Sequence, residues 1–237
     1  MKKKNVRYVS KQSEKIIFNR MVREKADGFI KKGTFTNEIV WGSHSYIISK
    51  LDKRKQKSFK KGMFLFGMVR KDVKNFLILT PEVKLPRRYS QIEYSKTLDE
   101  RLFGKITATD LNHAYWRIAL NLGIISEYTY FKGLADEFKA VRLAALSTMG
   151  AVKKYQKIKD GKLTDKYLLT KGDEAMQTVY KLIRYTCYKY MYQVKKLLGK
   201  DFLCYKTDAI YYCDTKHNRL IVEEFFIKKD LLIKQLD

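Results

Sequence analysis

Apolar residues recur at helical spacing in four stretches of the chain, and each stretch predicts an amphipathic helix. The longest runs from Asp173 to Leu198, with acidic residues in its first turn and two lysines and Gly199 at its end, as the polarity of a helix prefers. The other three predicted helices cover residues 12–32, 114–125 and 133–154. Long amphipathic helices therefore form much of the predicted fold.

Shorter apolar runs predict strands. Between residues 203 and 213, apolar and aromatic residues flank Lys206-Thr207-Asp208 on both sides, the pattern of two strands joined by a tight turn. Another short strand is expected to end near Asp110, just before the helix that begins at Ala114. Further strands are predicted over residues 63–69, 75–80 and 220–226, and polar loops or turns over 53–61, 157–171 and 214–218.

The net charge and the aromatic content of the chain indicate the kind of partner that it binds. The 237 residues are 45% hydrophobic, enough for a packed core, but they carry a formal net charge of +25 together with 17 Tyr and 13 Phe. Residues 1–70 alone carry a net charge of +14. Basic residues mixed with stacking rings indicate a nucleic-acid-binding protein, with a basic N-terminal region.

Cysteine usage and hydropathy exclude several classes. The three cysteines form no CxxC pair, so structural zinc is not expected, and their odd number favours a reducing compartment. The first residues lead into no apolar run of signal-peptide length, and no stretch approaches a membrane span. We expect a protein of the cytoplasm, in a bacterial host cell, with no membrane partner.

Two acidic residues stand in similar surroundings. Asp110 follows a predicted strand and precedes a helix, and Asp208 lies at the tip of the predicted hairpin. Two such carboxylates could share divalent metal ions. Each has an ordinary explanation as well, since Asp caps helices and occupies hairpin turns.

From about residue 101 the predicted elements follow the order strand with acid, helix, helix with cation, long helix, hairpin with acid and strand, which is the order in palm domains of nucleotide polymerases. Within it, Asp110 to Tyr115, Arg142 to Gly150 and Tyr205 to Asp208 resemble three motifs of family B DNA polymerases, above all the small phage and mobile-element branch. The first family motif, Asp, four residues and Tyr, is matched by Asp110-Leu-Asn-His-Ala-Tyr115, although Trp116 replaces the usual Pro. The second, Lys, three residues and Asn-Ser-x-Tyr-Gly, is matched by Arg142 to Gly150 with Leu and Met in place of Asn and Tyr.

The third family motif is Tyr-x-Asp-Thr-Asp, and it is matched by Tyr205-Lys206-Thr207-Asp208 if Lys206 replaces the first acid. A rival register would use Tyr212-Cys-Asp214-Thr-Lys216 instead. The resemblance covers roughly residues 101–226. It implies an α+β fold: a palm with an antiparallel sheet and helices on one face, short helical fingers at about residues 117–150, and a separate basic region over residues 1–100.

The resemblance also implies roles for individual residues. Asp110 and Asp208 would be catalytic and hold two Mg²⁺ or Mn²⁺ ions; one ion activates the primer hydroxyl and the other holds the triphosphate. The incoming deoxynucleotide would contact Leu111 through its backbone, Tyr115 as the group that excludes a ribose 2′-hydroxyl, and Lys139, Arg142 and Ser147. The primer-template would contact Gly150, Lys153, Tyr205 and Lys206, with Lys206 turned away from Asp208 toward a phosphate.

Two parts of a typical family B polymerase have no counterpart in the sequence, and this limits the activity that we expect. No DxE pair of a proofreading exonuclease precedes the palm, and about thirty residues after Asp208 are too few for a normal thumb. The sequence therefore predicts a minimal DNA-directed DNA polymerase of phage or plasmid replication, working with an accessory replication protein or as a homo-oligomer. The alternative is a palm that has lost catalysis and acts as a basic replication factor.

Overall fold

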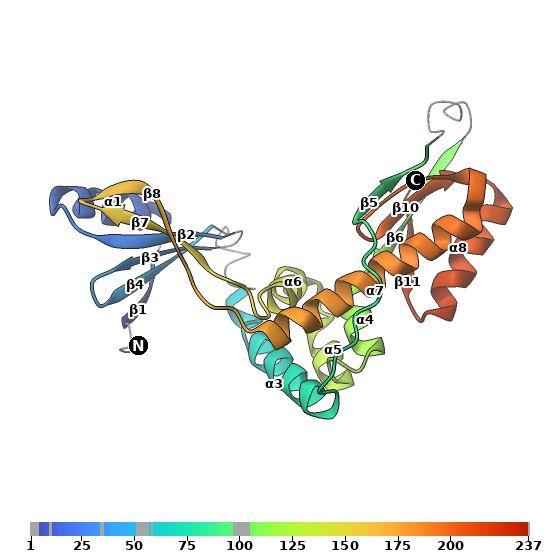
Figure 1. The fold of residues 1–237 in the computed structure, drawn as a ribbon, viewed down its shortest axis with the longest axis horizontal. Helices are drawn as coiled ribbons and strands as arrows, with labels where there is room; N and C mark the ends of the chain where they lie inside the picture. The colour runs from blue at the N-terminus through green and yellow to red at the C-terminus, as the bar shows by residue number, and fades with distance from the viewer. Residues whose placement is uncertain are drawn as a thin grey trace. The chain divides into compact units, whose positions relative to one another are not determined.

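A computed structural model describes residues 5–9, 11–33, 36–50, 57, 59–96 and 105–236. The protein has α+β architecture with two mainly antiparallel sheets, which confirms the predicted class at this level (Figure 1). The chain divides into unit 1, residues 1–63 with 150–173, and unit 2, residues 64–149 with 174–237. The first boundary thus falls after residue 63 rather than near 100, and unit 1 also takes a segment from the middle of the chain.

Unit 1 is built on a six-stranded sheet in the order β1-β4-β3-β2-β7-β8, with β1 parallel to β4 and the other pairs antiparallel. Its strands are β1 (Asn5–Val9), β2 (Gly28–Lys32), β3 (Thr36–Trp41), β4 (His44–Ser49), β7 (Lys154–Lys159) and β8 (Lys162–Leu169). Helix α1 (Lys11–Arg23) packs Ile17 and Met21 onto buried isoleucines of four strands: Ile30, Ile39, Ile48 and Ile158. This small core lies on one face of the sheet.

The hairpin β7–β8 occupies residues predicted as a surface loop. Asp160 and Gly161 form its turn as expected, but Ile158 pairs with Gly28 and packs under α1. Gly161 has φ of +74° and its N–H donates to the carbonyl of Ala26, and a Cβ there would lie 2.3 Å from the backbone of Val22. The polar side chains of this segment hid a strand pairing between residues about 130 positions apart.

The helix predicted over residues 12–32 is also shorter. Helix α1 ends at Arg23, Lys25 has a positive φ of 45°, and β2 begins at Gly28. A Cβ at Gly28 would lie 2.5 Å from the carbonyl oxygen of Val40, so the close strand pairing there requires glycine. Most of the predicted basic loop, residues 53–61, lies outside the described residues.

Unit 2 contains a five-stranded sheet in the order β11-β6-β10-β9-β5, antiparallel throughout. The strands are β5 (Ile92–Tyr94), β6 (Ile106–Asn112), β9 (Phe202–Lys206), β10 (Ala209–Cys213) and β11 (Leu232–Leu236). The helices are α3 (Phe64–Leu79), α4 (Ala114–Asn121), α5 (Glu127–Gly133), the 3₁₀ turns η2 (Asp136–Phe138) and η3 (Gly199–Asp201), α6 (Lys139–Ser147), α7 (Glu174–Leu198) and α8 (Lys216–Lys228).

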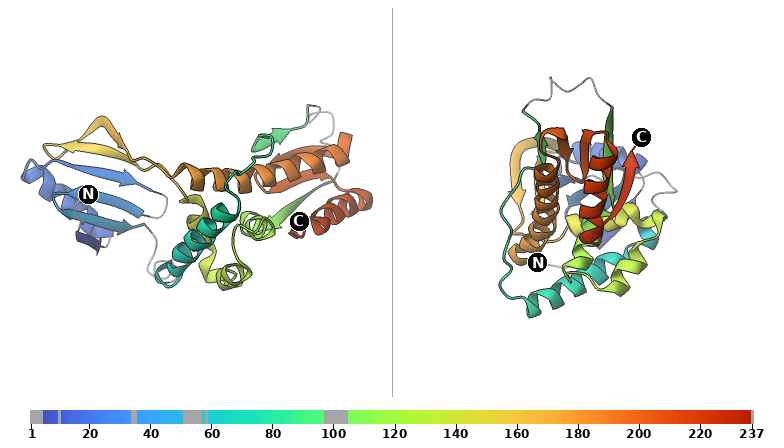
Figure 2. Two further views of the ribbon diagram at one scale, coloured as in Figure 1. Left: turned by 60° about the horizontal axis from the view of Figure 1, so that its bottom comes forward. Right: turned by 90° about the vertical axis from the view of Figure 1, so that its right-hand side faces the viewer.

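The main core of unit 2 lies on one face of this sheet. Leu111 of β6 and Ile210 of β10 point toward buried residues of α4, α7 and α8, among them Ile118, Met191 and Phe226. Figure 2 shows the unit from two further directions, with α7 and α8 along the sheet. Because side chains alternate along a strand, the neighbours of Leu111 and Ile210 face away from these helices.

Three segments predicted as strands lie almost entirely in two helices. Residues 63–69 and 75–80 belong to the single helix α3, whose buried residues Leu65, Val69 and Val73 recur every four positions. Residues 220–226 lie in α8, where the side chain of Thr215 accepts a hydrogen bond from the N–H of Asn218 and caps the helix. In both, exposed apolar residues on the solvent side disguised the helical period.

Of the remaining predicted helices, two are confirmed and one is interrupted. Helix α7 and helix α4 confirm the predictions over 173–198 and 114–125, apart from their ends. The segment 133–154 breaks into η2 and α6, and Gly150 has a positive φ of 61° where the helix is already over. At Gly133, the last residue of α5, a Cβ would lie 2.5 Å from the Trp116 ring, so the close contact there requires glycine.

Candidate functional site

Asp110 lies on a strand of unit 2, and Asp208 lies in the turn that leads into the neighbouring strand. Asp110 is the fifth residue of β6, and Asp208 belongs to the tight turn between β9 and β10. Ala209 pairs directly with Asp110, and the N–H of Leu111 donates to the carbonyl oxygen of Asp208 at 3.0 Å. The structure therefore brings together two carboxylates that are almost a hundred residues apart in sequence.

The hairpin turn itself is held from the side. Thr207 has a positive φ of 61°, a conformation that this two-residue turn requires. Its N–H donates to the carbonyl oxygen of Gln91 at 2.8 Å, and the Gln91 side chain donates to its hydroxyl at 3.1 Å. These contacts fix the position of Asp208, and Gln91 is a residue that sequence reasoning missed.

Burial disfavours the charged form of both acids, and at Asp208 the charge of Asp110 adds to this effect. The pKa of Asp208 is raised by burial and by the charge of Asp110, against a smaller opposing effect of Lys139. Burial likewise raises the pKa of Asp110, while Lys139 and Lys234 act to lower it. Lys139, at the start of α6, is thus the cation that both acids share.

A row of side chains crosses the face of the sheet that points away from the core. Its members pair from strand to strand in the order Ile92, Lys206, Ala209, Asp110 and Lys234. Lys206 is exposed, and the small Ala209 separates it from Asp110. The pKa of Asp208 is therefore affected by Asp110 and Lys139, and the pKa of Asp110 by Lys139 and Lys234. Lys206 lies one strand further from Asp110.

Arg142 is not available to a triphosphate in this structure. Only 2% of the residue is exposed, and its guanidinium donates to the carbonyl oxygens of Gly133 and Ala135. It also bonds Nδ1 of His113 at 3.1 Å, and His113 itself has a positive φ of 55° just before α4. Arg142 therefore holds α6 against the start of α4. This structural role could not be inferred from the position of Arg142 in the sequence motif.

His113 was not singled out from the sequence. Burial and the nearby charges of Arg142 and Lys139 lower the pKa of its imidazole, which favours the neutral ring. A neutral ring can accept the hydrogen bond from Arg142 at Nδ1 and keep the proton on Nε2. The ring thus links the buried arginine to the residue three positions after Asp110.

Tyr115 belongs to α4 and lies close enough to Asp208 for that charge to affect its pKa. Its hydroxyl is 3.2 Å from the hydroxyl of Tyr188, which also accepts hydrogen bonds from Arg184 of α7. Burial, together with the Tyr188 hydrogen bond, raises the pKa of Tyr115 far above its ordinary value, and Asp208 adds to this shift. Tyr115 is therefore a neutral ring held by Tyr188 and Arg184, neither of which was predicted.

Two other residues predicted to contact nucleotide or DNA form hydrogen bonds within the protein instead, and a third is exposed. The N–H of Leu111 donates to Asp208 and cannot also donate to a phosphate. Tyr205 is fully buried, with its hydroxyl donating to the carbonyl of Ser90 and to Glu93. Ser147 is exposed at the end of α6, and its hydroxyl lies 3.4 Å from the carbonyl oxygen of Ala144.

Gly150 and Lys153 belong to unit 1, whereas the acids belong to unit 2. Lys153 is exposed, and its charge helps to lower the pKa of Lys31, which burial lowers most. The rival acid Asp214 lies at the opposite end of β10 from Asp208, where Arg219 binds its carboxylate and holds its pKa low. The structure therefore separates Asp214 from Asp110.

Within the described ranges, no group of three or more His, Cys, Asp or Glu side chains is placed to hold a metal ion, and no helix is long and apolar enough to cross a membrane. Asp110 and Asp208 thus form a pair rather than a complete cage. Comparisons with protein-family models, with curated proteins and with solved structures gave no match to this chain.

Proposed function

We propose that unit 2 is a polymerase palm and that the protein is a small DNA-directed DNA polymerase that transfers nucleotides from deoxynucleoside triphosphates. One observation carries the proposal: Asp110 lies on β6 and Asp208 lies in the turn just before the paired strand β10, with Ala209 opposite Asp110 and raised pKa values on both carboxylates. Two partly buried like charges side by side are an unfavourable arrangement that a bound cation relieves.

The donor set suits Mg²⁺ or Mn²⁺. Mg²⁺ is commonly held by one or two carboxylates together with water and substrate phosphates, so two acids without a third protein ligand are sufficient. Asp110 and Asp208 would hold the two ions, whose chemistry is to activate a primer hydroxyl and neutralise the triphosphate. The protein's own part is to fix the two carboxylates, which the Gln91 contacts to Thr207 and the Leu111 to Asp208 hydrogen bond support.

Lys139 replaces Arg142 as the proposed phosphate ligand. It is exposed at the start of α6 and acts electrostatically on both acids. A lysine ammonium in that place attracts the phosphates of an incoming nucleotide. Arg142 would then act as a positioning residue, because its contacts with Gly133, Ala135 and His113 hold α6 against the start of α4.

Tyr115 would lie under the sugar of the incoming nucleotide, as the family resemblance suggests. Its ring is clamped by the Tyr188 hydroxyl, and Arg184 in turn holds Tyr188. A rigid ring excludes an added 2′-hydroxyl better than a mobile one, since displacement would break this network. Lys206 and Lys234, on the sheet face with Asp110, would contact the phosphates of the primer-template.

The test is primer extension on a primed DNA template with Mg²⁺ or Mn²⁺. Wild type should add nucleotides, and Asp110→Asn and Asp208→Asn should each abolish addition while retaining DNA binding. Asp214→Asn is the matched control, because that acid serves Arg219 at the far end of β10 and should be dispensable. Loss of activity in Asp214→Asn with retention in Asp208→Asn would favour the rival register.

A second candidate function is a catalytically inactive palm that serves as a basic replication factor. Lys206 at the position of a family acid, and the absence of a third acid near the pair within the described residues, favour it. If wild type adds no nucleotide under any metal condition and Lys206→Asp does, this second function replaces the first.

A further inference from the structure

The sheet of unit 1 has a second face, opposite α1. Strand pairing places two rows of side chains on it, and none of them belongs to the core under α1. One row runs Tyr8, Ile47, Glu38 and Lys31 and continues to Tyr155 and Leu168, and the other runs Val6, Ser45, Val40, Phe29 and Lys157. We call these eleven residues the open face.

Large apolar groups at the two edges of this face are accessible, whereas Val40, Ser45 and Tyr155 further in are buried. Tyr8 is 66% exposed, and Val6 and Leu168 are about half exposed at 52% and 50%. Phe29, in the middle of the sheet, is partly exposed. Among the described helices, α1 is the one that packs against this sheet, and it does so on the other side (Figure 2). Two rings, Tyr8 at the edge and Phe29 further in, are therefore at least partly accessible, and no described helix covers them.

The charge on the open face is positive. Lys31 and Lys157 belong to the rows, and Lys153 is close enough to affect the pKa of Lys31. The one acid, Glu38, already accepts hydrogen bonds from Ser45 at 2.7 Å and from Tyr155 at 2.9 Å. Glu38 is thus hydrogen-bonded within the sheet and its charge also acts on Lys31, so it offsets only part of the positive charge of the three lysines.

Unit 1 as a whole shows the same bias. It holds twenty-five Lys and Arg against eight Asp and Glu, a net charge of +17 in 87 residues, whereas unit 2 carries +8 in 150. An apolar protein partner would not need this excess of charge. A polyanion that also presents flat rings matches both features, and only single-stranded nucleic acid offers unpaired bases beside its phosphates.

We propose that the open face of unit 1 is a binding platform for single-stranded DNA, on which bases stack against Tyr8 and Phe29 while phosphates meet Lys31, Lys153 and Lys157. This goes beyond the proposed nucleotidyl transfer, because binding here needs neither the carboxylates of unit 2 nor a metal ion. In a replication enzyme such a face would hold the unpaired template.

The test measures binding of a fluorescent twenty-nucleotide thymidine oligomer to the full chain by anisotropy, in EDTA, so that metal-dependent binding at the acids is removed. Tyr8→Ala and Phe29→Ala should each weaken binding by about 5- to 150-fold, the usual loss when a stacked ring is removed. Lys157→Gln should lower the salt dependence by about 0.7 in the slope of log K against log salt. Circular dichroism checks that each variant is folded.

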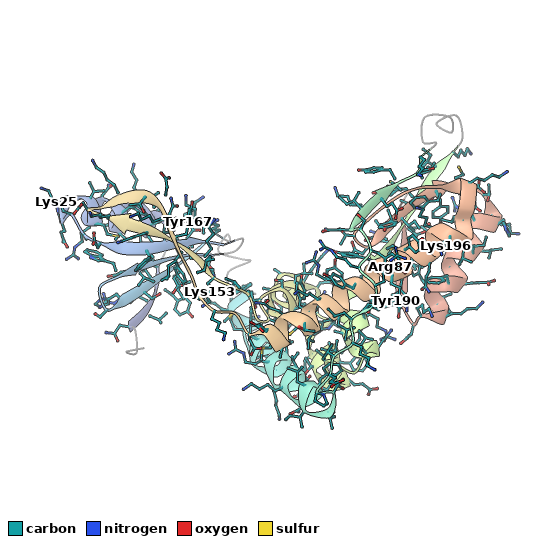
Figure 3. The ribbon with its side chains drawn as sticks, in the orientation of Figure 1. Lys25, Arg87, Lys153, Tyr167, Tyr190 and Lys196 are labelled. Atoms are coloured by element: carbon teal, nitrogen blue, oxygen red, sulfur yellow. The ribbon has the colours of Figure 1, made fainter. Side chains whose placement is uncertain are left out.

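Matched controls come from the other face of the same unit. Tyr167 is 50% exposed, lies beneath the ammonium of Lys154, and pairs with Gln156 rather than with an open-face residue (Figure 3). Tyr167→Ala should leave the affinity within twofold of wild type. Equal losses in Tyr167→Ala and Tyr8→Ala, or no loss in Tyr8→Ala, would overturn the proposal.

Duplex DNA supplies the second comparison. Its bases are already stacked, so Tyr8→Ala should weaken binding to the single strand and leave binding to a duplex of the same length almost unchanged. Equal losses for both would refute stacking. The carboxylate variant Asp208→Asn should bind the oligomer as wild type does, so a failure of the polymerase proposal and a failure of this one remain distinguishable.

Discussion

Replacing Asp208 with Asn should stabilise unit 2 when no metal is present. The pKa of Asp208 is raised in the folded protein by burial and by Asp110, so folding opposes its ionisation. A carboxyl group with a raised folded pKa contributes stability below its unfolded pKa and loses that contribution as pH rises through the folded value. At neutral pH the wild-type pair is therefore a source of instability that the Asn variant lacks.

The size of the gain follows from the spacing of the strands. Side chains at neighbouring positions on paired strands lie about 5–8 Å apart, and two unit charges about 7 Å apart repel by about 2.4 kcal/mol at an effective dielectric constant of 20. Both acids are partly exposed, so solvent screening reduces this to about 1 kcal/mol. For a chain of this length that corresponds to about 2–4 °C in Tm.

Trp116 provides a probe for unit 2, since it is buried and donates to the carbonyl of Tyr130. The second tryptophan, Trp41, lies in unit 1, so a Trp41→Phe background leaves one reporter. In EDTA at pH 7, Asp208→Asn should unfold at a higher temperature than its parent, and the difference should vanish near pH 4.

Metal should reverse the order of stability. An ion at a hundred times its Kd adds about 2.7 kcal/mol to wild type and little to the variant, which lacks one ligand. Asp214→Asn should gain nothing in EDTA, because Arg219 already lowers the pKa of that acid. A lower Tm for Asp208→Asn in EDTA would refute the repulsion, and equal metal stabilisation of variant and wild type would refute the shared site.

Four further outcomes are expected. Overall DNA affinity should fall at least tenfold between about 50 and 200 mM salt because of counterion release, and a flat response in a salt titration would refute nucleic-acid binding. Tyr115→Val should admit ribonucleotides, measured as the ratio of deoxy- to ribonucleotide incorporation, and an unchanged ratio would remove its role as the gate. Lys206→Ala should raise the primer Kd a few-fold without altering the metal titration, whereas a shifted titration would place Lys206 at the ions. Primer extension during a single encounter with the template should stop after a few nucleotides, and products hundreds of nucleotides long would contradict the expected weak hold on the primer-template.

The parts of unit 2 that surround the acids could be predicted because their signals are local. Helix α7 has a long apolar stripe and charged ends, and the hairpin β9–β10 has a tight turn between two apolar runs. The strand with Asp110 followed at once by a helix also shows in sequence. The strand register that places Ala209 opposite Asp110 does not, since it depends on pairing between distant segments.

Other features of the site could not be predicted from the sequence because they depend on tertiary contacts. Arg142 reads as a phosphate ligand in a motif, but its burial against the carbonyls of Gly133 and Ala135 is set by how α5 and α6 meet. The positive φ of His113 was not predicted, and the sixteen residues of α3 were predicted as two strands because a mostly polar stretch separates the apolar runs at its two ends.

The middle segment of the chain that completes unit 1 determines the order in which the protein can form during synthesis. Strand β2 has no partner on one side until β7 emerges from the ribosome, more than a hundred residues later. Until then the nascent sheet presents an open edge at β2, which invites pairing with other chains. Truncation after residue 63 should leave that edge permanently exposed, so a soluble fragment of unit 1 would need residues 150–173 joined directly to residue 63.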